Sequence, residues 1–180
     1  MIKQKSFIYQ FKNEIDELNF FVNDTNFYAF QSLIENDNRL SFLCGPQKSG
    51  KTFLSQIWLK KNNGVEFKNN FELLINNKFN ILIDDFLMFE QEKIFHLVNN
   101  CILNNLKILI TSNNQINEIK FKFNDLSSRL KTFTNLEIKQ PNDEMLLTIL
   151  TKLLIDKQFI INSDDIFEYI LRRVDRTYQG

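Results

Sequence analysis

Residues 45–52 constrain the fold more than any other part of the chain, because they read Gly-Pro-Gln-Lys-Ser-Gly-Lys-Thr. They fit the pattern Gly-x-x-x-x-Gly-Lys-Ser/Thr, in which a phosphate-binding loop joins a buried strand to a helix. Gly45 lets the chain turn sharply off the strand, and Gly50 keeps Cβ atoms away from a phosphate. Backbone N–H groups and the N-terminus of the following helix then face the anion. The pattern therefore predicts a nucleotide site on an α/β fold.

All eight residues of this loop are expected to bind the nucleotide: Gly45, Pro46, Gln47, Lys48, Ser49, Gly50, Lys51 and Thr52. Lys51 is expected to reach the β- and γ-phosphates, and the Thr52 hydroxyl is a candidate Mg²⁺ ligand. ATP or ADP, together with Mg²⁺, are therefore the expected cofactors. An ordinary turn ahead of a helix is the alternative, but the apolar run before the loop and the helical pattern after it favour phosphate binding.

Two carboxylates follow a second apolar run, residues 79–83. Residues at the carboxyl ends of parallel strands face the ligand crevice, so Asp84 is expected to serve Mg²⁺. Asp85 is expected to polarise an attacking water. Asn113 follows the next apolar run and is placed to orient the γ-phosphate or that water. The alternatives are a strand-end pair that caps a helix for the two acids and a simple turn residue for Asn113.

Apolar runs alternate with amphipathic helical patterns up to about residue 141. Strands are expected at residues 40–44, 65–67, 79–83, 106–111 and 135–138, and helices at 27–34, 52–61, 71–75 and 90–103, with a helix or turn at 123–131. This alternation predicts a parallel sheet covered by helices on both faces. From residue 142 the pattern becomes purely helical, with helices expected at 142–156 and 164–174. The sequence thus predicts an α/β core followed by a small helical piece.

Charge, apolar content and cysteine spacing restrict the class of protein and its expected compartment. The 180 residues carry 22 basic and 22 acidic side chains, so no overall field draws the chain to nucleic acid or an anionic membrane. A hydrophobic content of 43% is typical of a globular chain. There is no signal-peptide core and no apolar run of ~18 residues. Cys44 and Cys101 lie in apolar surroundings without a Cys-x-x-Cys motif. We expect a soluble, cytoplasmic protein with buried thiols and no membrane contact.

Four motifs occur in the order of an AAA+ ATPase core, namely GPQKSGKT, ILIDD, ITSN and DLSSRL, and a helical segment with an arginine follows them. Longer segments, including FVNDTNFYAFQSLI, IFHLVN, DLSSRLKTFTNLEIKQPNDEMLLTIL and RRVDRT, resemble the DnaA family. The chain looks most like the short regulatory branch of that family, the Hda type in its alphaproteobacterial style. The resemblance covers about residues 4–180. It implies a three-layer AAA+ core over residues 1–141 and a short helical lid over residues 142–180.

The resemblance also assigns roles to single residues. The loop 45–52 and Asp84 would hold nucleotide and Mg²⁺, and Asn113 would be the sensor at the strand end, where many relatives have an Asp nearby. Arg129 in SSRL matches the arginine finger that acts in trans on ATP bound to DnaA. Arg176 in VDRT matches the nucleotide-sensing arginine of the lid. A solvated surface position is the alternative for either arginine, although Arg is the planar donor used against phosphate charge.

The implied partners are the DnaA initiator and the sliding clamp of DNA polymerase. Hda-type proteins bind the clamp through an N-terminal peptide of Gln-Leu-x-Leu character. Residues 1–12 hold a degenerate version in Gln4 and Phe7, with Lys5 where an apolar residue is expected. A frayed terminus is the alternative for this segment. Self-association into a homo-oligomer stays open.

Spacing separates this chain from other members of the family. DnaA initiators and related helicase loaders carry extra helices before the acidic strand, where they engage single-stranded DNA. Here the interval from Thr52 to Asp84 has room for little beyond one helix, one strand and a short helix. The sequence reaches Gly180 without a helix-turn-helix domain, so an initiator that reads DNA sequence is not expected. The lid also ends soon after Arg176 and is expected to be minimal or truncated, which weakens the role of that arginine.

These observations together predict a nucleotide-bound regulator of replication initiation that stimulates ATP hydrolysis by DnaA through Arg129. A self-sufficient ATPase or DNA-loading factor is the first alternative, with Asp85 as its catalytic base. A small-molecule P-loop kinase is the second, but it would need a basic substrate pocket and a lid insertion, and neither is evident in the sequence.

Overall fold

The computed structural model describes residues 20–158, 164–173 and 175–178. Five strands form one parallel sheet in the order β2-β3-β4-β1-β5. The strands are β1 (Leu40–Cys44), β2 (Val65–Glu66), β3 (Ile81–Ile83), β4 (Ile108–Ser112) and β5 (Thr134–Glu137). Because β1 and β3 flank β4, the loops that follow these three strands meet at one edge of the sheet.

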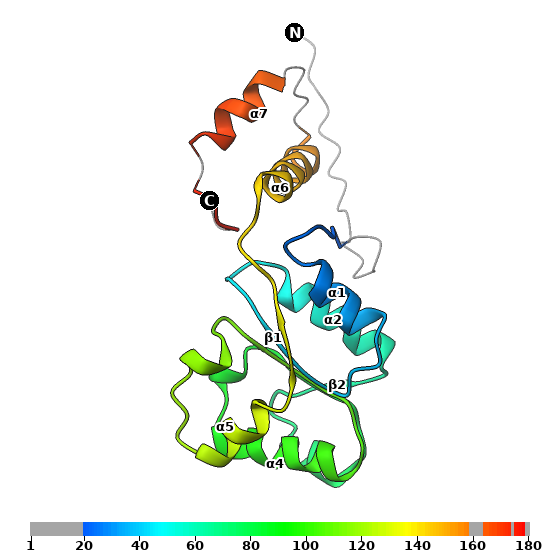
Figure 1. Cartoon of the computed structure of the whole chain (residues 1–180). Coiled ribbons are helices and arrows are strands. Elements are labelled where there is room, and N and C mark those ends of the chain that lie inside the picture. Colours follow the sequence, from blue (N-terminus) through cyan, green and yellow to red (C-terminus); the bar gives the residue numbers. More distant parts are fainter. Residues whose placement is uncertain (1–19, 159–163, 174, 179–180) are drawn as a thin grey trace.

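Helices connect the strands and form a separate group at the end of the chain. They are α1 (Phe27–Ile34), α2 (Lys51–Lys61), α3 (Phe71–Asn76), α4 (Gln91–Leu103), α5 (Asn124–Leu130), α6 (Asp143–Asp156) and α7 (Asp164–Leu171). Two short 3-10 helices, η2 (Phe86–Met88) and η3 (Ile116–Glu118), follow β3 and β4. In Figure 1, α1 and α2 lie on one side of the sheet, α4 and α5 lie on the other, and α6 and α7 stand apart from these layers.

The sheet separates two apolar cores because successive strand residues face opposite sides. Ile81 and Ile83 of β3 face the core against α3, α4 and α5, whereas Leu82 between them faces the core against α1 and α2. Strand β4 repeats this alternation, with Ile110 on the first side and Leu109 on the second. All five side chains are fully buried. The predicted three-layer α/β core is therefore confirmed.

Some element bounds differ from the sequence-based expectation. Strands β3 and β4 begin at Ile81 and Ile108, two residues later than expected in each case. Phe79 and Leu106 are half-buried and pack against the apolar core, but they lie outside the strand ladders, so hydrophobicity alone overestimated the strands. Helix α7 ends at Leu171, earlier than the expected residue 174.

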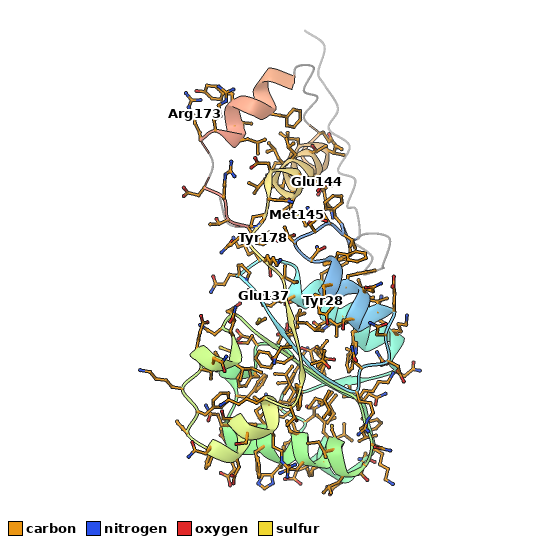
Figure 2. All side chains as sticks on the ribbon, viewed as in Figure 1. Tyr28, Glu137, Glu144, Met145, Arg173 and Tyr178 are labelled. Carbon is orange, nitrogen blue, oxygen red and sulfur yellow. The ribbon has the colours of Figure 1, made fainter. Side chains whose placement is uncertain are left out.

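Polar contacts join the segment before α1 to the helical piece that begins at α6. The Asn142 side chain accepts a hydrogen bond from the Met145 N–H at 2.9 Å and so caps the N-terminus of α6. The same oxygen accepts a second bond from Asn23 Nδ2 at 2.9 Å. Tyr178 donates to the Lys139 carbonyl at 3.1 Å, and burial raises the pKa of its hydroxyl. Figure 2 shows Met145, in the first turn of α6, and Tyr178 on the side of the helical piece that faces the core.

The lid expected over residues 142–180 corresponds in position to α6, α7 and the residues after them, and the boundary at residue 141 stays a prediction. Within the described part of the chain, no helix combines the length and the apolar character needed to cross a bilayer.

Candidate functional site

The predicted phosphate loop lies between β1 and α2 and has no room for side chains at its glycines. Gly50 has φ +93°, and a Cβ there would lie 3.1 Å from Phe20 Cε2. A Cβ on Gly45 would lie 2.8 Å from the carbonyl oxygen of Ile138. Because L side chains rarely adopt the first conformation and the second position is closed by backbone, both glycines are required by the loop itself.

Three stacked phenylalanine rings lie beside this loop, and their arrangement was not predicted from the sequence. Phe20 stacks on Phe30 with ring centroids 5.8 Å apart, and on Phe53 of α2 at 6.0 Å. The same Phe20 ring is the group that faces Gly50. No local signal in the sequence marks Phe20, since the contact joins residues thirty positions apart.

Lys51 is a nearly buried cation held by the loop that it belongs to. Its Nζ donates to the carbonyl oxygens of Gly45 at 2.8 Å and Pro46 at 2.6 Å, and the residue is only 9% exposed. Burial lowers the pKa of Lys51 from its ordinary value, and Asp84 and Asp85 act in the opposite direction. Charged Lys51 therefore costs folding free energy at neutral pH, and this cost fades as the pH rises through its lowered pKa. An anion in the loop would offset the cost, because it would give the ammonium a charged acceptor in place of carbonyls.

Two threonine hydroxyl groups donate hydrogen bonds to the carboxylate of Asp84. The Thr52 hydroxyl donates to Asp84 Oδ2 at 2.9 Å, and the Thr111 hydroxyl donates to Asp84 Oδ1 at 2.6 Å. The Asp85 N–H in turn donates to Thr111 Oγ1 at 2.8 Å. Asp85 has φ 49° and ψ 63°, a left-handed conformation that is uncommon for a residue other than glycine. Thr111 was not among the predicted site residues.

These side chains fit a Mg²⁺ ion that is shared with a nucleotide. The Thr52 hydroxyl directs its proton to Asp84, so its lone pairs remain available to a cation. Among the described residues, no three His, Cys, Asp or Glu side chains gather as a metal-binding group. Thr52 and Asp84 would therefore supply the protein ligands, with phosphates and water completing the shell, as is usual for Mg²⁺ in such sites.

One cavity of about 440 Å³ brings together predicted residues from three separate segments. It is lined by Gln47, Lys48, Gly50, Lys51, Thr52, Asp84, Asp85, Thr111 and Asn113. Gly45 and Pro46 contribute the carbonyls that hold Lys51, and Ser49 carries a buried hydroxyl without a hydrogen-bond partner among the described residues. The spacing of the motifs thus identified groups that meet at the carboxyl ends of β1, β3 and β4.

Two predicted arginines do not line this cavity. Arg129 is exposed in the last turn of α5 and is not among the lining residues. Arg176, expected in the helical piece at the end of the chain, lies beyond the end of α7. Its guanidinium is exposed and pairs with Asp143 of α6 at 3.1 Å, and it does not line the cavity. Gln4 and Phe7 lie outside the described residues.

A second cavity of similar size, about 390 Å³, also lies at the carboxyl ends of the strands, on the side of β5. It is lined by Cys44, Gln115, Ile116, Asn117, Lys131, Asn135, Leu136 and Glu137. Burial is the main cause that raises the pKa of the Cys44 thiol, which is therefore protonated at neutral pH. None of the predicted site residues lines this second cavity, so the first cavity is the candidate site.

Solved structures of DnaA share the fold. The chain superposes on AMPPCP-bound DnaA from Aquifex aeolicus with a TM-score of 0.70 and 19% identity, over 91% of this chain and 62% of that one. For the replication initiator DnaA bound to AMPPCP and single-stranded DNA, the TM-score is 0.73 with 17% identity, over 90% of this chain and 60% of the other. Domain III of the Thermotoga maritima DnaA gives 0.73 with 20% identity, over 93% and 84% of the two chains.

The chain therefore has the α/β fold of the AAA+ domain of DnaA, which confirms the predicted fold class. It spans less than two thirds of the first two DnaA chains, at 62% and 60% of their length. No family model matches the sequence, and no curated protein matches it. At these identities the likeness extends to the fold, and the activity has to be argued from the site.

Proposed function

We propose that this chain is a nucleotide-binding AAA+ regulator of replication initiation, of the Hda type, which stimulates ATP hydrolysis by DnaA. Support for nucleotide binding comes from the cavity that joins the phosphate loop to Asp84 and Asn113. In this role Lys51 and the loop N–H groups bind the phosphates, and bound ATP or ADP keeps the regulator in its active shape. Mg²⁺, held by Thr52 and Asp84, would neutralise phosphate charge.

The observation that carries the regulatory role is the position of Arg129. Its guanidinium is exposed and has no ion pair or side-chain hydrogen bond to any described residue. It does not line the chain's own nucleotide cavity. An arginine placed in this way is available to a neighbouring subunit, where its planar donors suit the charge that develops on a transferring phosphoryl group.

A pull-down experiment tests the partner. We expect the immobilised chain, loaded with ADP and Mg²⁺, to retain ATP-bound DnaA and to retain more of it when the sliding clamp is present. A variant with Gln4 and Phe7 replaced by alanine should lose only the increase due to the clamp. Failure to retain DnaA under any nucleotide condition would exclude the proposed partner.

A second candidate function is ATP hydrolysis by the chain alone, as in a self-sufficient ATPase or DNA-loading factor. It is favoured by one observation, since Asp85 and Asn113 line the same cavity as Lys51. A candidate base, a sensor and the phosphate loop are therefore present in a single chain.

The two candidates differ in the effect expected from Asp85→Asn. If the chain is a regulator, steady-state ATPase assays without DnaA should give no turnover above background, both for the wild type and for this variant. If the chain is an ATPase, wild-type turnover should be measurable and should fall about 10²–10⁴-fold in Asp85→Asn. Asp125→Asn removes an exposed carboxylate in the first turn of α5 and serves as the matched control.

A further inference from the structure

Thr111 connects the two acidic residues of the candidate site. It lies on β4, directly across the sheet from the end of β3, because the register pairs Ile83 with Ile110. Its hydroxyl donates to Asp84 Oδ1 at 2.6 Å and accepts from the Asp85 N–H at 2.8 Å. The Thr111 residue is only 1% exposed, whereas Asp84 and Asp85 are half-buried.

The directions of these bonds restrict what can replace the hydroxyl. A threonine hydroxyl has a single proton, and here that proton is committed to Asp84. Its lone pairs remain free to accept the Asp85 N–H. Valine has the same shape but neither a donor nor an acceptor, so it would leave the half-buried Asp85 N–H without Thr111 as its acceptor and Asp84 Oδ1 without its donor.

The two contacts have different consequences at the site. With Oδ1 held by Thr111, the other oxygen of Asp84 is directed toward Thr52, on the side where Mg²⁺ is expected. The bond to the Asp85 N–H helps hold that residue at φ 49°, a conformation that costs free energy without support. We therefore propose that Thr111 is a positioning residue that orients Asp84 for Mg²⁺ and fixes the backbone of Asp85.

This inference rests on the proposed binding of nucleotide with Mg²⁺, but its test includes a measurement that needs no ligand. Hydrogen exchange at the Asp85 amide reports the bond to Thr111 directly, in the full chain without nucleotide. We expect exchange about tenfold faster in Thr111→Val than in the wild type, because one hydrogen bond is lost. Thr111→Ser keeps the hydroxyl and should exchange at nearly the wild-type rate.

Titration with a fluorescent ATP analogue measures the second consequence. With Mg²⁺, Thr111→Val should bind about tenfold more weakly than the wild type, and Thr111→Ser within about twofold of it. With EDTA in place of Mg²⁺, all three proteins should bind alike. Thermal unfolding of the ligand-free proteins verifies that both variants are folded.

Several outcomes would overturn the inference. Unchanged Asp85 exchange in Thr111→Val would exclude the positioning of Asp85. An equal loss of affinity with and without Mg²⁺ would indicate a general structural effect and would exclude the orientation of Asp84. If the wild type binds no nucleotide at all, the proposed function fails, and Asp85 exchange still decides whether Thr111 holds that residue.

Discussion

Lys51→Ala is expected to abolish nucleotide binding while the chain remains folded. Hydrogen bonds to charged groups contribute about 1.5–3 kcal/mol each, and Lys51 is expected to contact both the β- and the γ-phosphate. Losing two such contacts weakens affinity roughly 10²–10⁴-fold. Titration with fluorescent ATP and ADP measures this loss. A thermal-shift assay should show that ATP raises the melting temperature of the wild type and leaves that of the variant unchanged.

The geometry of the nucleotide-free chain explains why this effect should be large. Lys51 is 9% exposed, and its donors are directed to the loop carbonyls of Gly45 and Pro46. Burial lowers its pKa, so the charged side chain is held at a cost that a phosphate would offset. Alanine removes this nearly buried charge. The other lysine of the loop, Lys48, is exposed.

A matched control separates this local effect from a change in overall charge. Lys78 is an exposed lysine ahead of β3, at the amino ends of the strands and therefore at the edge opposite the cavity. Lys78→Ala should bind ATP and ADP as the wild type does. If Lys51→Ala retains wild-type affinity, the cavity is not a phosphate site and the proposed function is wrong.

Much of this site could be predicted because its parts are local in the sequence. The phosphate loop is one continuous segment whose glycines are required by backbone conformation and close contact, as Gly50 and Gly45 confirm. The strands could be located because buried strands of a parallel sheet are apolar on both faces. Asp84 and Asn113 follow such runs, so the parallel topology brings them to one edge.

The remaining features depend on contacts that no local pattern encodes. Thr111 is the last residue of the strand expected at 106–111, and its role appears only when the register places it beside Asp84. Phe20 lies next to Gly50, where it stacks on Phe30 and Phe53. The helix before Arg176 ends at Leu171, earlier than expected, and the guanidinium pairs with Asp143. Tertiary contacts, rather than propensity, determine these positions.

Arg129→Ala is expected to leave the chain's own nucleotide affinity unchanged and to abolish its stimulation of DnaA. An arginine finger contributes about 10³–10⁵ to the rate of phosphoryl transfer. DnaA mixed with the variant should therefore hydrolyse ATP at the rate of DnaA alone. The measurement is single-turnover hydrolysis by DnaA preloaded with labelled ATP, with the regulator added in excess.

Two controls make this result specific to the guanidinium at that position. Arg129→Lys keeps the charge but loses the planar donor pair, so it should restore little of the stimulation. Arg39→Ala removes an exposed arginine ahead of β1, at the opposite edge of the sheet, and should stimulate as the wild type does. Pull-down of DnaA by Arg129→Ala must also be retained, since the finger acts on the reaction after docking.

The exposure of Arg129 makes this test decisive. No described residue pairs with its guanidinium, so alanine removes no ion pair or side-chain hydrogen bond from the fold. Because Arg129 does not line the cavity of the same chain, ATP and ADP affinity should not change. A variant that is folded, binds nucleotide, retains DnaA and still stimulates hydrolysis would exclude the trans arginine finger. If stimulation is lost while the variant stays folded, binds nucleotide and retains DnaA, Arg129 acts on the transition state of ATP hydrolysis at DnaA.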